Sequence, residues 1–170
     1  MLTMHMRALR GAALGFFATF GLTLAGSTGA ADKPAMKDAP GKLSYVRVYT
    51  GTDGITHFAD EQLTLTSSGA SGAEAQLTVS PIGDVKGATF ASLKAGVTED
   101  WHVAPRRQFM VVIRGTVELS VADGQKRRFV PGQFVLLEDT TGKGHVTHIP
   151  GPEDHVALAV PVPDGVPTKR

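Results

Sequence analysis

The feature that most constrains the fold is a series of short segments in which apolar and polar residues alternate. Residues 73–79 (AEAQLTV) alternate strictly, and residues 117–121 (VELSV) place three apolar side chains on one face. Glycine, proline and aspartate separate these segments, and Asp123-Gly124 is typical of a tight β-hairpin turn. No stretch of the mature chain sustains a helical period. The pattern therefore predicts an all-β sandwich or barrel.

The expected strands form one domain, because a chain of 170 residues with 42% apolar residues is long enough for one substantial core. The last strand is expected to bury Val156, Leu158, Val160 and Val162 and to leave His155 exposed. The strands are expected near residues 43–49, 63–66, 73–80, 87–95, 99–104, 107–114, 116–122, 126–130, 133–138, 143–149 and 154–162.

The first residues have the layout of a secretory signal peptide. Arg7 and Arg10 precede an uncharged apolar run at residues 11–26, and small residues follow it. We predict a signal peptide over residues 1–31, a flexible lead-in over 32–42 and a barrel domain over 43–170. An uncleaved membrane anchor is the alternative. With cleavage, the protein is periplasmic or secreted and is not held in a membrane.

Composition excludes several classes of function. Without residues 1–31, which contain two basic and no acidic residues, the formal net charge changes from +1 to −1. No basic stripe remains that would favour a nucleic-acid partner. The chain contains no cysteine, so disulfides, thiol catalysis and Cys-ligated zinc are excluded.

Two motifs in the second half of the chain resemble those of cupins, the small jelly-roll β-barrels. The first cupin motif is Gly, five residues, His-x-His, a short gap, Glu, six residues and Gly. Five positions match its spacing here: Gly96, His102, Ala104, Gln108 and Gly115. The second motif is matched by Pro131-Gly132 and then by Gly142 and His145. The pattern DWHxxPRRQ…EDTTGKGH is similar to that of a group of short bacterial cupins.

The resemblance implies a single-domain jelly-roll barrel with a site inside it. Metal-binding cupins use the two histidines and the glutamate of the first motif and the histidine of the second. Carried over, this predicts a metal site of His102, Gln108 and His145, with Ala104 where one ligand is missing. An amide oxygen is a weaker donor than a carboxylate, and no ligand of the set is anionic. Fe, Ni, Mn or Zn are the candidate ions, and a hydrogen-bonded pair of histidines without metal is the alternative.

Further residues are candidates for binding the ligand. Gln108, Met110, Val112 and Arg114 share one face of the strand at residues 107–114, and both faces of that strand are apolar enough to need a cover. We expect the N-terminal segment or a partner subunit to cover the second face, which favours a homodimer. The predicted ligand-binding residues are Arg106, Arg107, Met110, Val112 and Arg114. For Arg106 and Arg107 the alternative is a solvated turn or a salt bridge to Glu138 or Asp139.

Three other side chains have weaker claims to a function. Trp101 faces away from His102 and is expected to pack in the core, whereas His57 is expected to be packed or exposed. His148 is expected to face outwards if His145 faces inwards. None of these residues is expected to be a ligand.

Two functions follow from these observations. The first is an exported cupin that binds a small anionic or carbonyl-bearing molecule, with metal-dependent chemistry of the oxidoreductase or isomerase type. The second is a metal-free module that binds or senses a small molecule with the same residues. The sequence leaves the two open, because the cupin fold hosts many functions.

Overall fold

The computed structural model describes residues 38–85 and 87–165 of the chain. The predicted signal peptide and residues 32–37 of the lead-in lie outside this part. The first strands are β1 (Lys42–Thr50), β2 (Thr56–Thr64), β3 (Thr66–Ser67), β4 (Thr78–Val79), β5 (Thr89–Leu93) and β6 (Thr98–His102). They are followed by β7 (Gln108–Arg114), β8 (Val117–Val121), β9 (Lys126–Phe129), β10 (Phe134–Leu137), β11 (His145–His148) and β12 (His155–Pro161). One 3-10 helix, Gly72–Gln76, lies between β3 and β4.

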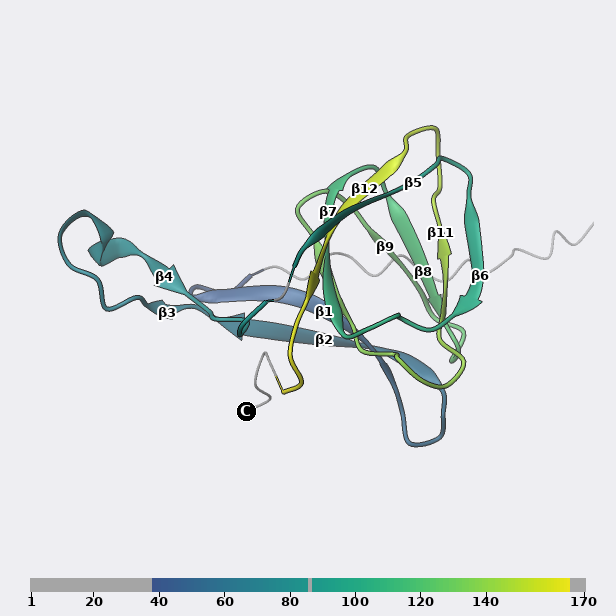
Figure 1. Ribbon diagram of the computed structural model, residues 1–170, viewed down its shortest axis with the longest axis horizontal. Coiled ribbons are helices and arrows are strands. Elements are labelled where there is room, and N and C mark those ends of the chain that lie inside the picture. Colours follow the sequence, from purple (N-terminus) through teal and green to yellow (C-terminus); the bar gives the residue numbers. More distant parts are fainter. Residues whose placement is uncertain (1–37, 86, 166–170) are drawn as a thin grey trace, which may run out of the picture.

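Two sheets face each other and form the barrel (Figure 1). The larger has six strands in the order β2-β1-β10-β7-β12-β5, and the smaller has four in the order β6-β11-β8-β9. Strands β1 and β10 pair in parallel, and the other pairs are antiparallel. The prediction of an all-β jelly-roll barrel is confirmed. Among the described residues, no helix is long and apolar enough to cross a membrane.

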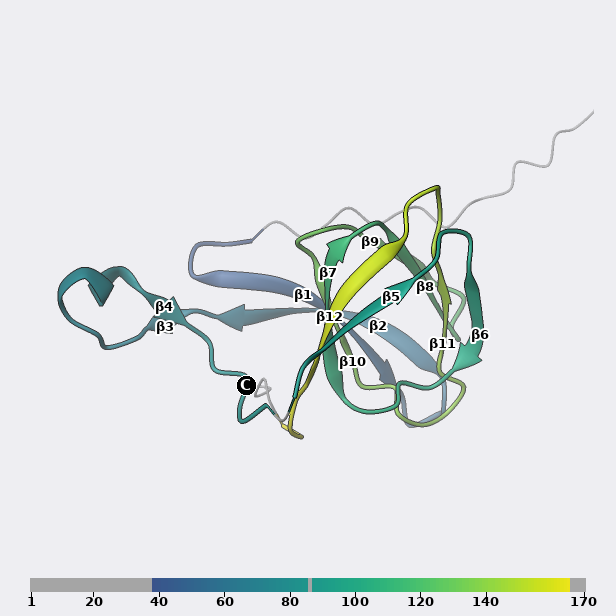
Figure 2. The same cartoon turned by 45° about the horizontal axis from the view of Figure 1, so that its top comes forward.

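Strands β3 and β4 form a separate two-stranded arm that extends away from the barrel (Figure 2). The alternation at residues 73–79 predicted one long strand here, but the chain forms the 3-10 helix and a two-residue strand. None of the helix residues is buried. Alternation indicates a strand only where one face packs on a core, and this segment has no core to face.

The main core lies between the two sheets. Val48, Val112 and Val135 of the larger sheet meet Leu119 and Phe129 of the smaller one. A second cluster covers the outer face of the larger sheet, as expected from the apolar second face of β7. It contains Tyr45, Leu63, Phe109, Leu136 and Val162, with Ile82 packed against it. Residues of this same chain thus supply part of that cover.

Strands β5 to β12 lie within two residues of their predicted bounds. The prediction for β2 is wrong, because the strand is not residues 63–66 but Thr56–Thr64, paired with β1 along its whole length. Asp60 and Glu61 interrupt its apolar pattern. Both are neutralised by distant arginines: Arg127 lies 2.5 Å from Asp60, and Arg47 lies 3.1 Å from Glu61.

Candidate functional site

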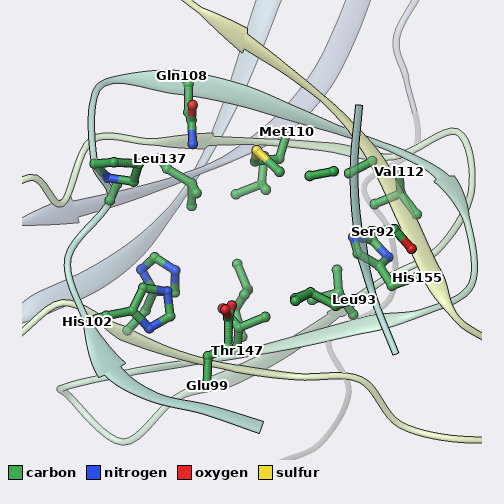
Figure 3. Close-up of a pocket in the computed structure, with 18 residues that line it drawn as sticks. Ser92, Leu93, Glu99, His102, Gln108, Met110, Val112, Leu137, Thr147 and His155 are labelled. Carbon is green, nitrogen blue, oxygen red and sulfur yellow. The ribbon is translucent and has the colours of Figure 1, made fainter. Parts of the chain in front are cut away.

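The barrel encloses a cavity of about 320 Å³ between the two sheets. Most of its wall is apolar, and its polar residues gather at separate places (Figure 3). Strands β5 and β6 each lie at one edge of their sheet, and both contribute exposed lining residues. The cavity is therefore reached from the side of these two edges. The lining residues are Ala91, Ser92, Leu93, Glu99, His102, Ala104, Pro105, Gln108, Met110, Val112, Val117, Leu119, Val135, Leu137, His145, Thr147, His155 and Ala157.

The structure brings the two motif histidines together on one wall. His102 ends β6, His145 begins β11, and the two residues are directly paired in the sheet. Their ring centroids are 4.5 Å apart, with an angle of 58° between the ring planes. Both residues line the cavity, and His145 is almost completely buried. This pair is the polar centre of the site.

Each of these rings has its Nδ1 atom committed to an oxygen acceptor. His102 Nδ1 lies 2.7 Å from the backbone oxygen of Asp100, and His145 Nδ1 lies 2.6 Å from Oδ2 of Asp139. A carbonyl oxygen only accepts, and so does an ionised carboxylate, so both Nδ1 atoms carry the proton. Nε2 is therefore the nitrogen of each neutral ring that offers a lone pair to a ligand.

Asp139 is the buried partner that the sequence did not single out for this role. Its side chain is fully buried, and its Oδ1 has no hydrogen-bond partner among the described residues. Its backbone oxygen accepts a hydrogen bond from the amide of Ala104. Asp139 thus orients His145 with its carboxylate and contacts the first motif with its backbone.

The turn of the second motif fixes the spacing of the histidine pair through the backbone. Gly144 has a positive φ of 75°, and a Cβ atom at this position would collide with the carbonyl oxygen of His102. The hydroxyl of Thr56, a buried residue of β2, donates a hydrogen bond to the backbone oxygen of Gly144. Only glycine allows this close approach of the two motifs.

A β-bulge adds Glu99 to the cavity wall. His145 pairs with His102 but Thr147 pairs with Glu99, so β6 has one residue more than β11 between these pairs. Simple alternation would place Glu99 on the opposite face from His102, whereas the extra residue brings both to the cavity side. No signal in the sequence marks this bulge.

Gln108, the third predicted metal ligand, is buried and faces the histidines from the opposite wall (Figure 3). Ala104 lines the cavity where the family has its second histidine. The described residues contain no group of three His, Asp or Glu side chains placed to hold a metal ion. Two imidazoles without an anionic ligand do not fit the four-ligand site that the family resemblance implies.

The predicted ligand-binding residues divide into two groups. Met110 and Val112 line the cavity, whereas the three arginines are not among its lining residues. Arg107 contacts Glu138 at 2.6 Å and the backbone oxygen of Pro163 at 2.5 Å. The other two, Arg106 and Arg114, are exposed at the surface.

The predicted exposure of His155 is wrong. His155 is 5% exposed and lines the cavity far from the His102 side (Figure 3). On β12 it is His155 and Ala157 that are buried, not Val156 and Leu158, which are half-buried. The last strand is apolar on both faces, so the alternation did not define which face is the inner one.

Burial lowers the pKa of His155 below its usual value of 6.5, although a hydrogen bond that the ring donates to the backbone oxygen of Arg114 opposes the shift. Between the lowered pKa and 6.5 the unfolded chain binds more protons, so the free energy of unfolding should fall as the pH drops below about 6.5. The slope is at most about 1.4 kcal/mol per pH unit for one proton. Urea denaturation of wild type and His155→Gln from pH 5 to 8 measures it. A variant with the wild-type slope would contradict this prediction.

The other singled-out side chains lie outside the cavity wall. His57 Nδ1 lies 2.9 Å from Oδ2 of Asp123, and the side chain is partly exposed. His148 is bonded through Nδ1 to the hydroxyl of Thr98 at 2.8 Å. Trp101 does face away from His102 but is not in the core: it is 39% exposed, beneath the ammonium group of Lys143.

The two facing sheets form a jelly-roll barrel in which both motif histidines are paired on adjacent strands. No family model matches the sequence of the chain, and no curated protein gives a significant match. Among solved structures the chain is similar to a cupin 2 conserved barrel domain protein from Salinispora arenicola, with 26% identity and a TM-score of 0.36. That match covers 43% of this chain and 59% of the other, which is less than two thirds of the latter's length.

Two further similar structures cover more of the chain at lower identity. One, from Silicibacter pomeroyi, is described as a sugar phosphate isomerase from a cupin superfamily. It has 17% identity and a TM-score of 0.37, and the match covers 74% of each chain. The other is the Cnp3 cupin domain of Schizosaccharomyces pombe. It has 8% identity and a TM-score of 0.38, and the match covers 72% of this chain and 85% of that one.

Proposed function

We propose that this protein binds a small organic molecule inside the barrel, with His102 and His145 as the polar contacts. The observation that carries the proposal is the cavity of about 320 Å³, apolar over most of its wall, with two adjacent imidazoles at one place. Ligand sites in proteins commonly have this size, and they combine apolar walls with a few convergent polar groups. The same residues would suit either a binding or sensing module or a catalyst.

Filling the cavity tests this proposal. Ala157 is fully buried in the cavity wall, and Ala157→Leu adds side-chain volume into the empty space. We expect monocyclic fragments that raise the thermal midpoint of wild type to have no such effect on this variant. Ala75→Leu makes the same chemical change on the exposed 3-10 helix and should respond like wild type. Equal midpoint shifts in all three proteins would place the binding outside the barrel and contradict the proposal.

The predicted metal-dependent enzyme is the second candidate. Metal-ligating histidines commonly donate one ring N–H to a carboxylate or a carbonyl, as His102 and His145 both do here. The chain would have only two imidazoles to hold a divalent first-row ion, and Gln108 faces them from across the cavity. Export and the homodimer stay predictions.

A further inference from the structure

The charge distribution around the cavity is unfavourable for an anionic ligand. The lining residues include one carboxylate, Glu99, and neither a lysine nor an arginine. A second carboxylate, that of Asp139, lies directly behind His145. Arg107, one of the predicted ligand-binding residues, forms an ion pair with Glu138. An anion entering the cavity would lose its hydration without meeting a fixed positive charge in return.

The hydrogen bonds of the histidine pair favour a ligand that donates hydrogen bonds. Each Nδ1–H is donated to an oxygen, so each neutral ring presents Nε2 as an acceptor. The described residues supply no hydrogen-bond partner for either Nε2 atom. Two neighbouring acceptors, with ring centroids 4.5 Å apart, are satisfied by a ligand that donates hydrogen bonds.

The rest of the cavity wall favours a ligand with an apolar body. Met110, Val112 and Leu119, from both sheets, line the cavity beyond the histidine pair. A small ring or a branched hydrocarbon body gains free energy by burial against these side chains.

From these three observations we propose that the cavity selects a neutral, hydroxyl-bearing molecule with an apolar body, and that the hydroxyl donates to Nε2 of His102 or His145. This inference rests on the proposed function, namely ligand binding in the barrel. It replaces the anionic or carbonyl-bearing ligand expected from the sequence, because the cavity wall contains a carboxylate and neither a lysine nor an arginine.

Three probes of equal ring size separate the ligand classes: 4-methylphenol donates a hydrogen bond, 4-methylanisole only accepts, and 4-methylbenzoate is an anion. Binding is measured by calorimetric titration of the full chain at pH 8. EDTA is present to remove metal ions, so that no probe can bind through a metal. We expect 4-methylphenol to bind about tenfold more tightly than 4-methylanisole, since the anisole leaves the buried acceptors unpaired. The benzoate should bind more weakly than the phenol.

Variants connect this preference to the histidine pair. His102→Leu should reduce the preference for the phenol over the anisole several-fold. His148→Leu is the matched control, because His148 lies on the same strand as His145 but outside the cavity wall, bonded to Thr98. It should keep the full preference. His102 is chosen in place of His145 because its ring nitrogen bonds a backbone oxygen and not a buried carboxylate.

The outcomes distinguish the inference from the proposed function. If all three probes bind equally well and Ala157→Leu abolishes their binding, the cavity binds ligands but the inferred preference is wrong. Tighter binding of the benzoate would likewise overturn the inference and leave the cavity as the site. If no probe binds wild type, the inference fails, and the fragment series with Ala157→Leu then decides the proposed function separately.

Discussion

Replacing His145 with alanine should lower the free energy of unfolding by about 3 kcal/mol, because it leaves a buried charged acceptor without its hydrogen-bond partner. Asp139 is fully buried, and its single side-chain hydrogen bond in the described structure is the 2.6 Å contact with His145 Nδ1. Without the imidazole, a buried carboxylate would remain with neither oxygen paired. Urea denaturation at pH 7 measures the loss.

A double variant shows whether the carboxylate causes the loss. Asp139→Ala combined with His145→Ala removes both partners, so its effect should be clearly smaller than the sum of the two single effects. His148→Ala, on the same strand but with only the Thr98 hydroxyl as its partner, should cost at most about 1 kcal/mol. Strict additivity of the Asp139 and His145 effects would show that the two side chains are not coupled.

Restoring the two ligands that the family motif contains should turn the cavity into a metal site. Ala104 and Gln108 both line the cavity, and Ala104→His with Gln108→Glu would add an imidazole and the first carboxylate of the set. Residues that only hydrogen-bond to the ligands of a metal commonly change the affinity of a protein for that metal by about 10–100-fold. Two added ligands should therefore raise the metal affinity by at least that much. Elemental analysis and the thermal midpoint in Ni(II) or Zn(II) measure the gain over wild type.

The wild-type protein in the same titration decides the metal candidate. If metal moves its thermal midpoint, and His102→Leu removes that shift, the histidine pair already holds an ion. If metal stabilises only the double variant, the natural site lacks the donors for tight binding. A double variant that gains no metal would show that positions 104 and 108 are not placed for a shared ion, contrary to the family resemblance.

Turn chemistry explains why most of the barrel could be predicted from the sequence. The Asp123-Gly124 and Pro131-Gly132 pairs separate β8, β9 and β10, and each of these strands has the predicted bounds within two residues. Such pairs act locally, through the backbone angles that they allow. The neighbouring alternation then fixes the inner face of β8, where Val117, Leu119 and Val121 are all buried.

The missed features depend on contacts between residues far apart in the sequence. The charges of β2, for example, are neutralised by Arg47 and Arg127. Glu99 enters the cavity only because of a bulge opposite β11. No local pattern encodes such partners, so the sequence could name His102 and His145 through motif spacing but could not place the charges around them.

The contact between Gly144 and the His102 carbonyl has a consequence for how the site could change. Because the main chain holds the two motifs together, the side chains at positions 102, 104 and 108 can be exchanged while the distance between the two motifs stays constant. The backbone of the barrel therefore keeps its geometry while the side chains inside it vary. The same backbone could hold a metal centre in one variant and a purely organic ligand in another.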